Sequence, residues 1–162
     1  MCHVSRQRVT HGVNVNVNVV VVAFVVTIVD LLSKLWAGHA LAHRSVHLLG
    51  PLWLRLAYNT GISFSLNRSG PVWTTLAVLL IVVIVAVVAL RAAPGISTVG
   101  FGLLLGGGVG NEVNRLVAIP HRVTDFIAFG TFPVFNLADV GVTLGCGVLI
   151  IALLRDATMV QK

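Results

Sequence analysis

The chain has 162 residues, which leaves room for one domain. Hydrophobic residues make up 57% of it and charged residues only 10%, and a mean hydropathy of +0.98 excludes an ordinary soluble core, so a lipid bilayer is the expected solvent. The formal net charge of +6 comes from basic residues scattered singly, which argues against a nucleic-acid-binding stripe and favours anchoring at a membrane interface.

Four segments of the chain have the length and apolar character of membrane-spanning helices, which need about 20 mostly apolar residues. The sequence predicts such helices over residues 17–36, 72–90, 96–117 and 135–154. The stretch 13–18 alternates like a strand, but its polar surroundings favour a helix entrance or a disordered leader. We therefore expect an all-α membrane protein with four transmembrane helices and both termini on one side.

The first loop, residues 37–71, contains two short runs with strand character. Val46–Leu49 and Leu52–Tyr58 are separated by a glycine–proline pair that favours a turn. We expect them to form a small β-sheet on the membrane surface, with Trp53 and Tyr58 as interfacial aromatic residues.

Polar side chains gather where the first, third and fourth predicted helices meet the loops 37–71 and 118–134. They are Asp30, Lys34, Asn111, Asn114, Arg115, Asn136 and Asp139. Within each helix their spacing brings several of them onto one side, and all the groups lie at one depth. Charged and polar groups in or beside hydrocarbon are costly, so this convergence predicts a functional site. Counting basic residues does not decide which side of the membrane it faces.

Asp125 and Asp139 are the candidate catalytic residues. Two carboxyl groups brought close together cannot both ionise at neutral pH, so one can deprotonate water while the other protonates a scissile carbonyl or leaving amine. The alternative is structural: Asp125 would cap a helix or pair with Arg115, and Asp139 would pair with Lys34. For either aspartate alone we favour the structural role, and for the pair we favour catalysis.

The remaining polar residues are expected to support this pair. Asp30 and Lys34 are one helical turn apart and can form an ion pair inside the membrane. Arg115 can hold a carboxylate through two hydrogen bonds. Asn59 can reach the site from the first loop, although it is equally suited to a turn before Gly61.

A metal or phosphate site is not expected. His39 and His43 have a metal-like spacing, but no Asp or Glu neighbours them, so we predict neither a metal nor a cofactor. The glycine-rich run 106–110 lies within a predicted helix and lacks the residues that complete a phosphate loop, so close helix packing explains it better.

Five ordered blocks resemble the lipoprotein signal peptidase (signal peptidase II) family of membrane aspartyl proteases. The blocks are Asp30–Lys34, Asn59–Ser65, Gly107–Arg115, Val123–Phe126 and Phe135–Asp139. The resemblance implies that Asp125 and Asp139 form the catalytic dyad. It further implies a supporting set of residues, namely Asn59, Asn111, Arg115 and Asn136 lining the site and Asp30 and Lys34 bracing it.

The resemblance also implies a substrate and a location. The substrate would be a bacterial prolipoprotein whose cysteine already carries diacylglycerol, and the cut would fall just before that cysteine. The chain would be one membrane-embedded domain of the bacterial cytoplasmic membrane, with both termini in the cytoplasm and the site near the outer leaflet. The sheet in the first loop would cradle the substrate, and the cyclic peptide globomycin would block it.

One position departs from the family pattern, because Asn114 stands where an aspartate normally precedes the arginine. Asparagine keeps one acceptor but loses a charge that could hold Arg115. The position is not one of the two implied catalytic aspartates, so we expect activity to survive. Two other readings stay open: a catalytically impaired paralogue that binds lipidated signal peptides, and a small transporter subunit that relays ions through Asp30, Lys34 and Asp139.

Overall fold

The computed structural model describes residues 16–59, 71–92, 95–117 and 122–160. The elements in chain order are α1 (Val17–Ala40), β1 (Val46–Leu49), β2 (Leu52–Asn59), α2 (Pro71–Arg91), α3 (Ile96–Val117), β3 (Val123–Phe129) and α4 (Leu137–Val160). All four predicted helices and both predicted strands are therefore confirmed as secondary structure. Residues 13–15 and the 60–65 part of the predicted site block lie outside the described residues.

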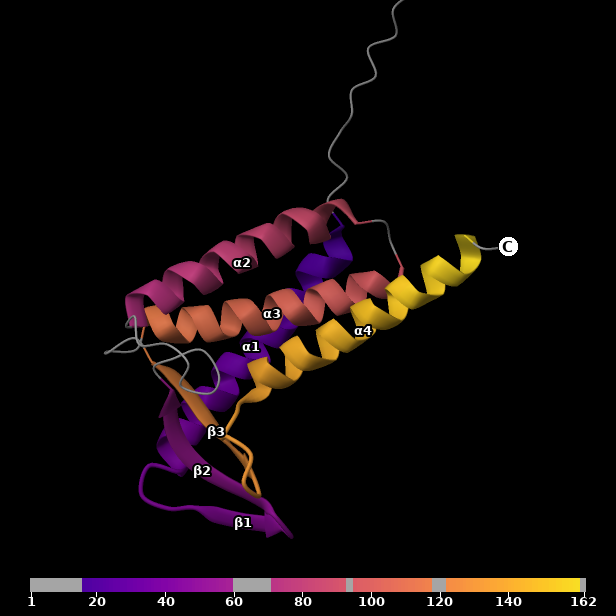
Figure 1. Ribbon diagram of the computed structural model, residues 1–162. Helices are drawn as coiled ribbons and strands as arrows, with labels where there is room; N and C mark the ends of the chain where they lie inside the picture. Colours follow the sequence, from indigo (N-terminus) through magenta and orange to yellow (C-terminus); the bar gives the residue numbers. More distant parts are fainter. Residues whose placement is uncertain (1–15, 60–70, 93–94, 118–121, 161–162) are drawn as a thin grey trace, which may run out of the picture.

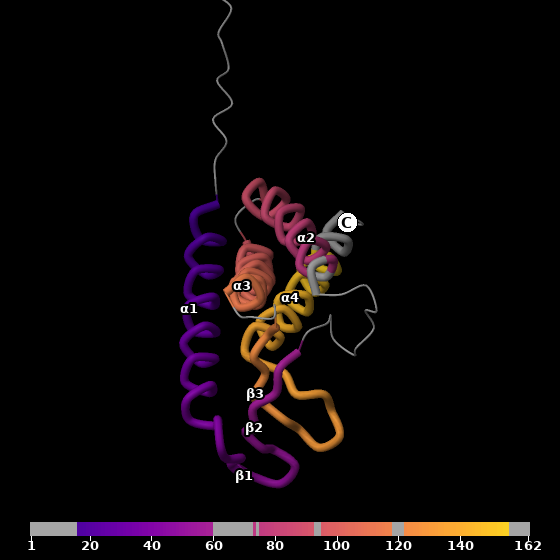
Figure 2. Tube along the Cα trace, turned by 90° about the vertical axis from the view of Figure 1, so that its left-hand side faces the viewer, coloured from indigo at the N-terminus to yellow at the C-terminus, as the bar shows by residue number. Residues whose placement is uncertain are grey.

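Helix α3 is the centre of the bundle and packs against α1, α2 and α4 (Figures 1 and 2). Its glycines allow this close approach. A Cβ atom at Gly106 would lie 2.6 Å from Cβ of Val26 on α1, and one at Gly107 would collide with the carbonyl oxygen of Ala138 on α4. The glycine-rich run thus serves helix packing, as expected.

The helices expose apolar side chains and bury polar ones. Phe24, Leu80 and Leu153 are 66%, 61% and 70% exposed, whereas Asp30 and Asn136 are fully buried. Among the described residues, α1 and the 137–155 part of α4 are long and apolar enough to cross a membrane, and α2 contributes a shorter apolar stretch. This inverted distribution is typical of helices that lipid surrounds.

The sheet has three antiparallel strands in the order β1-β2-β3 and lies at one end of the bundle (Figure 1). The sequence predicted only the two strands of the first loop, so the prediction was incomplete: β3 comes from the loop between α3 and α4. Its residues are almost all buried, so they lack the polar–apolar alternation that identifies a half-exposed strand. Ala57 of β2 pairs with Asp125 of β3.

Apolar contacts fasten β3 to the end of α1. Phe126 packs with Ala37 and Leu41, and its ring meets that of Trp36 edge-on at 6.4 Å between centroids. Neighbouring positions along a strand point to opposite faces, so burying Phe126 in this cluster turns Asp125 away from it. Asp125 is therefore positioned where the sheet joins the helix bundle.

Candidate functional site

Asn136 organises the start of α4. It immediately precedes the first helical residue, and its side-chain oxygen accepts a hydrogen bond from the Asp139 N–H at 3.0 Å. In return, Oδ2 of Asp139 accepts from the Asn136 N–H at 3.1 Å. This reciprocal arrangement is a capping box, and it satisfies two backbone N–H groups at the helix start. The local sequence Asn-Leu-Ala-Asp thereby fixes the Asp139 carboxyl group at the N-terminus of the helix.

The same asparagine bridges the two candidate aspartates. Its Nδ2 donates to Oδ1 of Asp125 at 2.6 Å and to Oδ1 of Asn111 at 3.1 Å. Asp125 is only 3% exposed and Asn136 is fully buried. Asp125 and Asp139, which come from β3 and α4, are thus brought together around one asparagine, whose side chain holds the first carboxyl group and whose backbone N–H holds the second.

A second chain of hydrogen bonds reaches Asp139 from α1. Lys34 Nζ donates to Oδ2 of Asp30 at 2.6 Å and to Oδ1 of Asn111 at 2.7 Å. Asn111 Nδ2 then donates to Oδ1 of Asp139 at 2.9 Å. The other oxygen of Asp30 accepts from the Ala138 N–H at 2.8 Å. The predicted Asp30–Lys34 pair is present, and Lys34 is linked to Asp139 through Asn111 in this chain.

Burial raises the pKa of Asp125 to about 6, and the negative charge of Asp139 adds to the rise. Hydrogen bonds from the side chains of Asn136 and Asn59, together with the charge of Lys34, act in the opposite direction. Asn59 therefore does reach the site from the end of β2. A carboxyl group with this pKa can hold a proton near neutral pH and release it during a reaction.

The polar residues near the end of α3 adopt an arrangement that the sequence analysis did not predict. Arg115 forms a buried ion pair with Glu112 at 3.5 Å, one turn away on the same helix. Asn114 accepts a hydrogen bond from the Thr124 N–H at 2.7 Å. Glu112 was missed as a partner, although its i,i+3 spacing from Arg115 was visible in the sequence.

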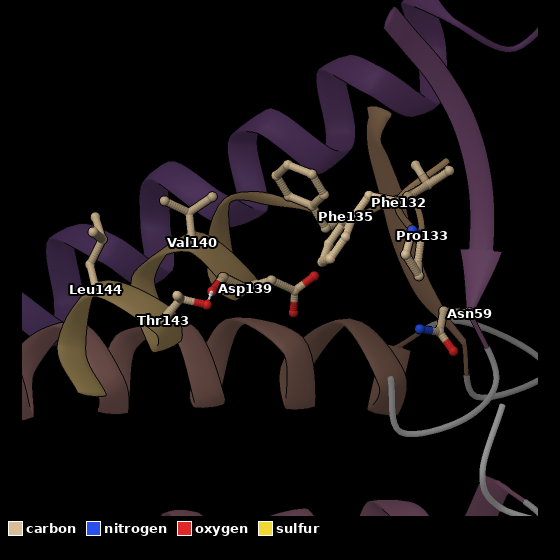
Figure 3. Close-up of a pocket in the computed structure, with 9 residues that line it drawn as sticks. Asn59, Phe132, Pro133, Phe135, Asp139, Val140, Thr143 and Leu144 are labelled. Atoms are coloured by element: carbon tan, nitrogen blue, oxygen red, sulfur yellow. Dashed lines mark hydrogen bonds between the residues drawn. The ribbon is translucent and has the colours of Figure 1, made fainter. Parts of the chain in front are cut away.

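A cavity of about 430 Å³ opens beside Asp139. Figure 3 shows the side chains of Asp139 and Asn59 extending into it from α4 and from the end of β2. The rest of its lining is mainly apolar and consists of Phe132, Pro133, Val134, Phe135, Val140, Thr143 and Leu144. A long apolar ligand would therefore be held with its polar part next to a carboxyl group. Within the described part of the chain, no cluster of His, Cys, Asp or Glu is suited to holding a metal.

A helix bundle with an apolar exterior and a buried carboxyl network is the architecture of a membrane enzyme. The family model for signal peptidase (SPase) II matches residues 22–155. The chain belongs to this family, and it is an aspartic peptidase.

Individual relatives agree with this assignment. A lipoprotein signal peptidase from Gloeobacter violaceus is 40% identical over 78% of this chain and 76% of the relative. Another from Chlorobium phaeobacteroides is 34% identical over 80% of this chain and 90% of the relative. A bacterial membrane enzyme solved by the in meso method at 2.3 Å has the same fold, with a TM-score of 0.77, 24% identity, and coverage of 88% of this chain and 90% of that one.

Proposed function

We propose that Asp125 and Asp139 are the catalytic dyad of this peptidase. The observation that carries the assignment is the Asn136 bridge, which hydrogen-bonds to both carboxyl groups within one buried network. The pKa of Asp125, about 6, supports its role as the partner that holds the proton. Asp139 is at the N-terminus of α4, where the helix dipole stabilises negative charge, so it serves as the ionised partner.

The reaction then follows from these two protonation states. The Asp139 carboxylate takes a proton from a water molecule as the water oxygen attacks the scissile carbonyl carbon. Asp125 gives its proton to the carbonyl oxygen, which yields a neutral tetrahedral intermediate. The intermediate collapses with cleavage of the C–N bond, and the leaving amine receives the proton held by Asp139. The proton of the collapsing hydroxyl returns to Asp125, which restores the starting state.

The remaining predicted residues have supporting roles. Asn111 and Asn136 orient the two carboxyl groups, and Asn59 donates to Asp125. Lys34 and Asp30 hold Asn111 and the first turn of α4 in place. These partners pre-organise the site, so little rearrangement is needed during the reaction.

The substrate class is a bacterial prolipoprotein that carries diacylglycerol on the cysteine after the cut. The mainly apolar cavity beside Asp139 suits such a molecule, because it offers hydrocarbon contacts next to the attacking carboxylate. Globomycin, as a cyclic peptide inhibitor of this family, would compete for the same cavity.

We also propose a membrane arrangement, which the shared position of the polar helix ends supports. All four helices cross the bacterial cytoplasmic membrane, both termini are cytoplasmic, and residues 1–162 form one embedded domain. The dyad and the sheet then lie near the outer leaflet. The polar network at the sheet end of α1, α3 and α4 supports a site at the membrane surface, because it requires access to water, and the choice of the outer side rests on the family.

A cleavage assay with a synthetic lipidated prolipoprotein peptide tests the function in detergent. The wild-type enzyme should cut before the modified cysteine, and Asp125→Asn and Asp139→Asn should each lose that activity while keeping their thermal stability and elution volume. Binding of the peptide without cleavage by the wild type would identify an impaired paralogue. Ion flux without either binding or cleavage would identify a transporter.

A further inference from the structure

The end of α3 is joined to β3 by one side-chain contact that the dyad itself does not use. Oδ1 of Asn114, in the last turn of α3, accepts a hydrogen bond from the Thr124 N–H at 2.7 Å. Thr124 immediately precedes Asp125. We propose that Asn114 is a positioning residue that sets the place of Asp125 through the backbone of Thr124.

The contact lies on the edge of β3 that faces away from β2, where Phe135 pairs only with the later residues Phe126 and Ile127. In the order β1-β2-β3, β3 has β2 on one side only, so its N–H groups that point away from β2 need other partners. Asn114 supplies such a partner to the N–H of Thr124, the second residue of the strand. Thr124 is 8% exposed, so water is poorly placed to replace the amide oxygen.

The charges around Asp125 determine what a change of charge at position 114 would do. Asp125 faces Asp139 from α4 and Lys34 from α1, while the amides of Asn136 and Asn59 donate to it. On α3 itself, Glu112 and Arg115 form an ion pair, so the two neighbouring charges offset each other. A carboxylate at position 114 would add a third negative group near the dyad.

Asn114 is also separate from the cavity beside Asp139. It lines a second cavity of about 430 Å³ together with Lys34, His39 and Thr124, and the two cavities share no lining residue. Removing the Asn114 side chain should therefore leave substrate contacts intact. Its effect is expected in kcat and not in KM.

The test compares two variants at position 114 with a matched control. Asn114→Ala removes the acceptor, and kcat should fall roughly ten- to a hundredfold with KM unchanged within about twofold, because a small displacement of a catalytic group is enough for such a loss. Asn114→Asp keeps an acceptor oxygen, so kcat should recover to within a few-fold of the wild type. The added negative charge should move the alkaline limb of its pH–rate profile to higher pH.

Asn16→Ala is the control, because Asn16 is a buried asparagine at the start of α1 that donates to the Thr98 hydroxyl at 3.0 Å, at the opposite end of the bundle. It should lower Tm by an amount similar to Asn114→Ala while leaving kcat and the pH profile unchanged. Equal kcat values for Asn114→Ala and Asn16→Ala would overturn the inference, as would an Asn114→Asp profile identical to that of the wild type. The inference rests on the proposed function, which fails separately if Asp125→Asn cleaves at the wild-type rate.

Discussion

Asn136 is the residue on which the geometry of the site depends most. Its side chain is fully buried, accepts one hydrogen bond and donates two, and its backbone N–H donates to Asp139. Its place in the site was predictable from the sequence, because it shares the polar face with Asp139. Its bridging role could not be predicted, because the contacts to Asn111 and Asp125 depend on how three separate elements pack.

Asn136→Ala should therefore impair both folding and catalysis. The variant loses the helix cap and leaves the donors and acceptors of its partners unpaired, which should lower the free energy of unfolding by about 1–3 kcal/mol. Cleavage of the lipidated peptide should fall roughly a hundredfold or more, because the Asp125 carboxyl group loses a side-chain donor and the helix start that carries Asp139 loses its cap. Thermal unfolding and steady-state kinetics measure the two effects. Activity equal to that of the Asn16→Ala control would contradict the bridging role.

The pKa of Asp125 predicts how activity depends on pH. Because Asp125 acts in its protonated form, kcat/KM should fall as the pH rises through about 6. The two carboxyl groups titrate together, so this alkaline limb of the pH–rate profile is a property of the dyad. A pH–rate profile with the lipidated peptide as substrate measures this limb. A profile that stays flat from pH 5 to about pH 8 would contradict the assignment.

Stability should show the same titration. The folded-state pKa of Asp125 lies above its ordinary value of 3.8, so protonation stabilises the folded state. That contribution, about 3 kcal/mol from the size of the shift, is complete below about pH 4 and is lost as the pH rises through about 6. Chemical unfolding from about pH 4 to about pH 7 should show a smaller loss of stability in Asp125→Asn than in the wild type. Parallel curves for the two proteins would contradict it.

At the scale of elements, the helices were predictable and the sheet was predictable only in part. Long apolar runs specify the helices because a membrane-spanning length leaves little choice of structure. The strand β3 was missed because its burial pattern, unlike that of β2, does not alternate. Because β3 was not predicted, the sequence located Asp125 on a loop, whereas the structure places it in a strand. The way in which Asp125 is held could therefore not be predicted.

The contact between α1 and α3 beside Asp30 offers a test of helix packing. A Cβ atom at Gly110 would lie 2.6 Å from Oδ2 of Asp30, the oxygen that Lys34 contacts. Gly110→Ala should therefore displace Asp30, weaken its bond to the Ala138 N–H and lower both Tm and kcat. Gly147→Ala on α4 is the matched control, because no atom lies within 4 Å of the added Cβ, and it should be neutral or slightly stabilising. Equal behaviour of the two variants would contradict this account of the packing.

The whole molecule combines an apolar exterior with a polar network confined to one end. The sheet lies at that end, while the N-terminus of α1 meets the C-terminus of α2 at the other, where the Asn16 N–H donates to the Leu90 carbonyl at 3.3 Å (Figure 1). Composition alone predicted a membrane protein. The side of the membrane on which the sheet lies could not be predicted from the residues, because the basic residues are spread over both ends.

Cysteine labelling in intact cells tests this orientation. In a background that lacks both native cysteines (Cys2→Ser and Cys146→Ser), Leu49→Cys at the 78% exposed tip of the sheet should react with a membrane-impermeant maleimide added from outside. Arg91→Cys, at the end of α2 that lies away from the sheet, should react only after the membrane is permeabilised. The reverse pattern would contradict the proposed topology.

A double-mutant comparison at Asp125 and Asp139 tests the central claim most directly. If the two carboxyl groups act as one unit, Asp125→Asn and Asp139→Asn should each lower kcat roughly 10²- to 10⁴-fold. The double variant should then be no slower than the less active of the two single variants, because effects within a catalytic unit do not add. Losses that multiply in the double variant, or a single variant that cleaves the lipidated peptide at the wild-type rate, would show that these aspartates do not share the reaction.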